Sequence, residues 1–107
     1  MNVRMDGKGF RFRITPEDLH ALLADRDLEH RLRVGGHNFG CRIAADGAEQ
    51  DMTLAMMEEG GFCLRVPRPM LEELHEMGVS RAGLSAQQDG VDISLQVDFK
   101  AQIGKAA

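Results

Sequence analysis

Residues 10–19 read FRFRITPEDL, and within this stretch the chain changes from one type of secondary structure to another. In the first half, apolar residues alternate with Arg11 and Arg13, which is the period-two pattern of a half-buried strand. In the second half, Thr15 offers an N-cap hydroxyl, and Pro16 suits the first helical position. The stretch therefore predicts a strand that leads directly into a helix, with both arginines on the strand face opposite the apolar one.

The rest of the chain contains further alternating apolar runs, bounded by glycine, proline or acidic turn residues. We expect the first helix to end at the charged residues 25–27, and a second helix to begin after Pro67 and stop at Gly78. The further strands are expected at residues 3–5, 28–34, 39–45, 52–56, 62–66, 82–86 and 91–99.

The predicted order is strand, strand, helix, strand, strand, followed by the same five elements again. An offset of 52 residues aligns the two halves without a gap, placing Gly9 on Gly61 and Leu32 on Leu84. We interpret residues 1–48 and 49–100 as a duplicated unit within a single domain, 1–107, whose tail is 101–107. The alternative is that two similar strand and helix units share apolar spacing without common descent.

Two such units predict an α+β fold. We expect an antiparallel sheet of about eight strands, strongly curved or closed into a barrel, because closure removes exposed strand edges. The two helices should cover the apolar face of this sheet. The pattern does not reveal which strands meet across the helical connections.

Composition excludes several classes of function. A net charge of −4 and a pI near 5.5 argue against binding to nucleic acid, which normally rests on a basic surface. No apolar run approaches the ~20 residues needed to cross a bilayer, so we expect no membrane association and a cytoplasmic location. Cys41 and Cys63 have no CxxC partner and are expected to be reduced thiols.

Arginines are concentrated on the predicted strands, whereas most acids lie on helices and turns. If the alternating apolar residues face the core, the arginines share the opposite face, where guanidinium groups suit phosphate or carboxylate oxygens. A first alternative is an ordinary solvated face, paired with Glu29, Asp51, Asp92 and Asp98. A second alternative is a protein interface, including that of a homodimer. The candidate anion-binding residues are Arg11, Arg13, Arg31, Arg33, Arg42 and Arg65.

No catalytic residue, metal site or cofactor site is identified. His37 and Cys41 lack a third ligand nearby, and no glycine-rich segment joins a strand to a helix as a phosphate loop does. We therefore expect a small soluble binding or interaction module rather than an enzyme. The alternative is a minimal phosphate-handling enzyme that uses the same arginines, with Asp92 and Asp98 as acids on the metal side.

The opening MNVRMDGKGFRFRIT resembles a family of small uncharacterised bacterial proteins with the pattern M-x-[IV]-R-x(5)-[IFL]-R-[IFL]-R-[IL]-T. That resemblance implies a bacterial origin and no particular activity. The duplicated architecture is also similar to that of the triphosphate tunnel enzymes, whose barrel interior is lined by basic residues. The chain lacks their paired-glutamate-then-lysine strand motif, and FRFRIT stands in its place.

Overall fold

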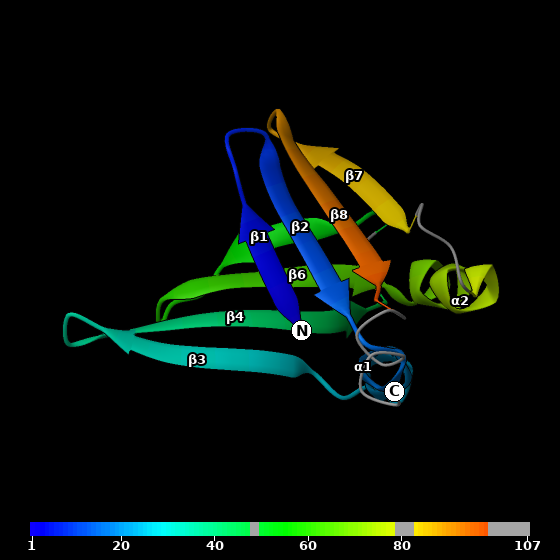
Figure 1. The fold of residues 1–107 in the computed structure, drawn as a ribbon, viewed down its shortest axis with the longest axis horizontal. Coiled ribbons are helices and arrows are strands. Elements are labelled where there is room, and N and C mark those ends of the chain that lie inside the picture. Colours follow the sequence, from blue (N-terminus) through cyan, green and yellow to red (C-terminus); the bar gives the residue numbers. More distant parts are fainter. Residues whose placement is uncertain (48–49, 79–82, 99–107) are drawn as a thin grey trace, which may run out of the picture.

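The computed structural model describes residues 1–47, 50–78 and 83–98 (Figure 1). Both expected helices and all the expected strands are found there, although the predicted positions 82 and 99 lie outside the described residues. The elements are β1 (Asn2–Met5), β2 (Gly9–Ile14), α1 (Pro16–Leu23), β3 (Leu28–Val34), β4 (His37–Asp46), β5 (Thr53–Met56), β6 (Gly61–Pro67), α2 (Arg68–Met77), β7 (Leu84–Gln88) and β8 (Val91–Val97).

The strands form two sheets of four. The first sheet has the order β1-β2-β8-β7 and the second has the order β3-β4-β6-β5. The outer pairs are antiparallel, whereas the central pairs, β2 with β8 and β4 with β6, are parallel. The α+β class with eight strands and two helices is thus confirmed, but the strands lie in two mixed sheets rather than in one antiparallel sheet or a barrel.

The strands lie in two sheets because the chain crosses from one sheet to the other at each helix. α1 carries the chain from β2 in the first sheet to β3 in the second, and α2 carries it back from β6 to β7. Each sheet is therefore assembled from strands of both halves of the chain, and these strands meet in parallel. Hairpin signals in the sequence predict only the antiparallel neighbours.

The two sheets are related by the repeat of the chain. If β1 to β4 are exchanged with β5 to β8, the order β1-β2-β8-β7 becomes β5-β6-β4-β3, which is the order of the second sheet read in reverse. The register follows the same rule, because Gly9 pairs with Asp92 in the first sheet and Gly61 pairs with Gly40, which is 52 residues before Asp92, in the second. At both glycines a Cβ atom would overlap main-chain atoms of the neighbouring parallel strand. Common descent of the two units stays a prediction.

The two hairpins that follow the helices differ in length. Leu32 pairs with Phe39 in β3–β4, and the equivalent pair in β7–β8 is Gln88 with Val91, which is the last pair before its turn. β3–β4 continues for two further residue pairs and extends away from the helices (Figure 1). In the structure, Leu84 therefore occupies the place in its hairpin that Leu28 occupies in the other one. The alignment of the two halves without a gap places Leu84 on Leu32 instead.

The core lies between the inner faces of the two sheets. Phe12 and Leu95 of the first sheet and Ile43 and Leu64 of the second are completely buried. The sheets cover each other's apolar faces, and α1 and α2 lie together at one end (Figure 1), where they contribute Leu19, Leu22, Leu71 and Leu74 to the core. The expectation that the helices would cover the sheet face therefore differs from the structure.

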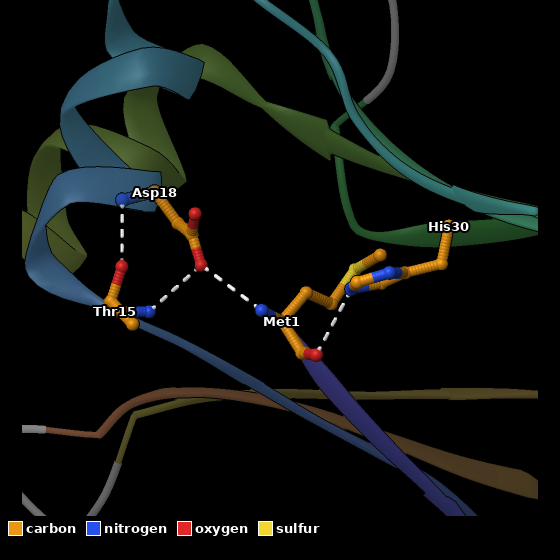
Figure 2. A network of polar contacts seen from close by, with 4 residues as sticks. All are labelled: Met1, Thr15, Asp18 and His30. Carbon is orange, nitrogen blue, oxygen red and sulfur yellow. Dashed lines mark hydrogen bonds and ion pairs between the residues drawn. The ribbon is translucent and has the colours of Figure 1, made fainter. Parts of the chain in front are cut away.

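The start of α1 is held by a capping box (Figure 2). The Thr15 hydroxyl accepts a hydrogen bond from the Asp18 N–H at 3.0 Å, and the Asp18 carboxylate accepts one from the Thr15 N–H at 3.1 Å. The same carboxylate forms an ion pair with the ammonium group of Met1 at 3.2 Å. The Met1 carbonyl also lies 3.2 Å from Nε2 of His30, so β1 is attached both to α1 and to β3.

Candidate anion-binding site

The structure divides the six candidate arginines between two surfaces. Arg11 and Arg13 lie on the outer face of the first sheet. The other four lie on the outer face of the second sheet, on β3, β4 and β6: Arg31, Arg33, Arg42 and Arg65. Because the two inner faces pack against each other, the outer faces point in different directions. The expectation of one shared arginine face is therefore wrong, and each surface has to be judged by itself.

On the second sheet, two arginines are paired with acids. The Glu29 carboxylate accepts a short hydrogen bond from Nε of Arg31, and its other oxygen lies 3.4 Å from Nη2 of Arg42. Arg42 also lies 3.8 Å from Glu59. The hydrogen bond from Arg31 lowers the pKa of Glu29 and, in turn, raises the pKa of Arg31. These arginines match the alternative of an ordinary solvated, ion-paired face.

The two other arginines of the second sheet lie apart from this cluster. Arg33 is opposite Asn38 near the tip of the β3–β4 hairpin. Arg65 lies beside the buried thiol of Cys63. Burial raises the pKa of this thiol, and the positive charges of Arg42 and Arg65 lower it by a smaller amount. No ion pair joins Arg33 or Arg65 to an acid in the described ranges.

On the first sheet, one row of side chains crosses all four strands. Arg4 of β1 lies directly opposite Arg11 of β2, which is beside Ser94 of β8, which is opposite Ser85 of β7. Like charges directly opposite each other on antiparallel strands are destabilising. Within residues 1–47, 50–78 and 83–98, neither arginine forms an ion pair. The row therefore carries two positive charges without an ion pair next to two hydroxyl groups, and the nearby Asp6 carboxyl has its pKa lowered mainly by main-chain hydrogen bonds, with a smaller effect from the charge of Arg11.

A depression of about 540 Å³ lies over Arg11, Ser94 and Ser85 of this row, and Arg4, which is opposite Arg11, is not among the residues that line it. Lys8 from the β1–β2 loop adds a third cation to this face. The polar lining is completed by Gln87 from β7 and by two acids. The depression is lined by Asp6, Lys8, Gly9, Phe10, Arg11, Ser85, Ala86, Gln87, Asp92, Ile93 and Ser94.

Both acids in the lining are occupied by neutral donors. The Asp6 carboxylate accepts hydrogen bonds from the main-chain N–H groups of Lys8 and Gly9, at 2.7 and 3.2 Å, and these bonds lower its pKa. The Asp92 carboxylate accepts a hydrogen bond of 2.9 Å from Nε2 of Gln87. Neither acid is within ion-pair distance of Arg11, so its guanidinium group keeps its donors for another partner.

The two acids named in the enzyme alternative do not lie together. Asp92 and Asp98 lie at opposite ends of β8, six residues apart, which corresponds to roughly 20 Å along a strand and is too far for a shared metal ion. In the part of the chain that the structure describes, no three metal-ligating side chains come together. The arginines also point away from the apolar interior, so the basic interior lining of the tunnel enzymes has no counterpart in these strands.

Sequence reasoning missed four residues of this site. For Arg4 and Lys8 a signal was present, because the short loop at residues 6–9 between two strands implies the register that places Arg4 opposite Arg11. For Ser85 and Ser94 there was none. Their position beside Arg11 depends on the parallel pairing of β2 with β8, which joins the first strands of the chain to the last.

The comparisons with known proteins place the chain in a family but give it no activity. The model of the family of unknown function DUF7009 matches residues 1–102. No curated protein and no solved structure matches the chain. Neither α1 nor α2, the helices within the described ranges, has the length and apolarity of a membrane-spanning segment. The cytoplasmic location stays a prediction.

Proposed function

Since the chain belongs to this family, for which no activity is known, we propose from the geometry that it is a small binding module that takes an anionic ligand on the outer face of the first sheet. The site consists of Arg4, Lys8 and Arg11 with the hydroxyl groups of Ser85 and Ser94. The observation that carries the proposal is the direct opposition of Arg4 and Arg11, neither of which forms an ion pair with an acid of the described ranges.

The chemistry of the ligand follows from these donors. A guanidinium group donates two parallel hydrogen bonds to phosphate or carboxylate oxygens, and serine hydroxyls add neutral donors beside it. An anion bound between Arg4 and Arg11 would convert a repulsive pair into two attractive contacts. The site is open to solvent, so affinity for a simple anion should be weak and should fall as ionic strength rises.

The arginines of the second sheet support this assignment by contrast. Arg31 and Arg42 already have Glu29 and Glu59 as partners, so an anion would have to displace a carboxylate. Arg13, which is opposite Asn2 and beside Gln96, extends the positive face of the first sheet beyond the depression. We therefore assign Arg13 to the margin of the site and place Arg11 at its centre.

The test is a thermal-shift titration with inorganic phosphate, triphosphate and chloride at matched ionic strength. We expect a saturable rise in the melting temperature with phosphate and triphosphate that chloride does not reproduce. Arg11→Ala should abolish this rise. Arg26→Ala, which removes an exposed arginine between α1 and β3, should leave it unchanged. A flat wild-type response, or equal losses in the two variants, would refute the proposal.

A further inference from the structure

In the described part of the chain, five large apolar side chains are exposed. Met5 and Met56 are 74% and 81% exposed, and Leu32, Val34 and Phe39 are 64%, 63% and 44% exposed. We call these five residues the open-end surface. They lie on β1, β5 and the β3–β4 hairpin, at positions whose alternation belongs to the inner faces of the sheets. The inner faces therefore extend beyond the region where the sheets cover each other.

These side chains are connected to each other. Leu32 is directly opposite Phe39, and the Phe39 ring lies 5.9 Å from the ring of Phe62, between centroids. Phe62 is directly opposite Met56. On the other side, the Phe62 ring lies 5.1 Å from that of Phe10, which is directly opposite Met5. The open-end surface is therefore one apolar area, continuous with the core through two partly buried phenylalanines.

Charge is absent from this side of the strands. The inward-facing positions of β1, β3, β4 and β5 contain no Asp, Glu, Lys or Arg, and the polar residues among them near the hairpin are His30 and His37. The charged residues of the hairpin, including Glu29 and Arg33, lie on its outer face. A surface without net charge does not repel an identical surface, although the chain as a whole has a charge of −4.

The area of the open-end surface matches what one subunit contributes to a dimer. If each of the five residues is given the roughly 200 Å² of an aromatic side chain, the exposed fractions amount to about 650 Å² in total. This is slightly above the 300 to 600 Å² or so of the largest apolar patch on a typical monomer. It is also most of the ~800 Å² that each partner contributes to a standard interface.

We propose that the open-end surface packs against the same surface of a second copy of the chain, forming a twofold homodimer. The apolar side chains supply the buried area, and the absence of charge makes the surface compatible with itself. The extended β3–β4 hairpin reaches beyond its own sandwich and presents Leu32, Val34 and Phe39 to the partner. The anion-binding site on the outer face of the first sheet is not needed for this contact.

The experiment is sedimentation equilibrium of the full chain from about 1 µM to about 500 µM, a range that covers the affinities of an interface of this size. We expect the wild type to reach twice the 11.8 kDa mass of the chain. Leu32→Glu places a charge in the interface of both copies and should weaken dimerisation at least about tenfold. Circular dichroism should show it folded, because Leu32 is largely exposed.

The matched control is Asn38→Glu, which introduces the same charge on the outer face of the same hairpin and should leave the dimer intact. A wild type that is monomeric throughout the concentration range, or a Leu32→Glu variant that dimerises as well as the wild type, would overturn the proposal. A monomeric wild type that pellets with vesicles of phosphatidylcholine and phosphatidylglycerol would also overturn it, since the surface would then belong to a lipid bilayer.

Discussion

The side-chain amide of Gln88 is hydrogen-bonded to both main-chain groups of Leu54, accepting from its N–H at 2.8 Å and donating to its carbonyl at 2.9 Å. Gln88 ends β7 in the first sheet, and Leu54 lies on β5 at the edge of the second. The amide thus pairs with an otherwise open strand edge as a neighbouring strand would, and it joins the two sheets at this corner.

Replacing Gln88 should weaken the contact between the two sheets at this corner. We expect Gln88→Leu to lower the free energy of unfolding by about 1 kcal/mol, because both main-chain groups of Leu54 lose their partner. Gln88→Glu keeps an acceptor for the N–H but places a carboxylate oxygen against the Leu54 carbonyl, so its loss should be at least as large. Urea unfolding followed by circular dichroism measures both. An unchanged midpoint in Gln88→Leu would show that water replaces the amide at no cost.

Gly61 is required by the close approach of β6 to β4. A Cβ at this position would overlap main-chain atoms of Gly40, and the φ angle of 103° is one that side-chain-bearing residues rarely adopt. We expect Gly61→Ala to destabilise the protein by at least about 2 kcal/mol or to prevent folding. Gly7→Ala is the control, because Gly7 is surrounded by open space. Thermal melts of equal midpoint in both variants would contradict this account.

The capping box predicts a dependence on pH. Partial burial opposes ionisation of Asp18, but hydrogen bonds from the Thr15 N–H and the Met1 ammonium outweigh it and lower its pKa. A lowered pKa in the folded state gives a contribution that is present above the unfolded value of about 3.9 and is lost as the pH falls through the folded value. Asp18→Asn should therefore cost about 1 kcal/mol at pH 7.

The difference between Asp18→Asn and the wild type should begin to shrink once the pH falls below about 4, because the carboxyl of the unfolded chain is then protonated, and it should be lost as the pH falls through the lowered pKa of the folded state. Urea unfolding at pH 7 and at pH 3 measures this. Glu17→Gln serves as the control in the same turn of α1, where Glu17 is exposed. A difference of the same size at both pH values would mean that the charge of Asp18 is unimportant.

The two cysteines should be unreactive in the folded protein. Burial raises the pKa of Cys41 to about 11, and that of Cys63 is also raised by burial. Cys41 faces the core and Cys63 faces outward from the neighbouring strand, so their side chains point apart and cannot form a disulfide. Ellman's reagent at pH 8 should find no fast-reacting thiol in the native protein and both thiols in guanidinium chloride. Rapid reaction of the native protein would contradict the burial.

Local patterns predicted most of the elements but little of their assembly. Alternation and capping residues such as Thr15 placed the strands and helices, because they act within a few residues along the chain. The pairing of β2 with β8 brings together residues more than 80 positions apart, as Phe10 with Ile93 shows, and no local signal encodes it. For the candidate site, the sequence therefore predicted the residue type but not the location. Alternation predicts that Arg11 and Arg31 avoid the core, but it does not predict that they lie on different sheets.

The unequal length of the two hairpins has a consequence for assembly. Exchange of the two units maps β3–β4 onto β7–β8 and Met5 onto Met56, so a perfectly repeated molecule would carry a second long apolar hairpin beside the same open-end surface. In this chain the position equivalent to Leu32 is Gln88, whose amide is bound to Leu54. Within the described residues β7–β8 therefore adds no exposed large apolar side chain, and the proposed contact with a second copy would use one hairpin of each chain.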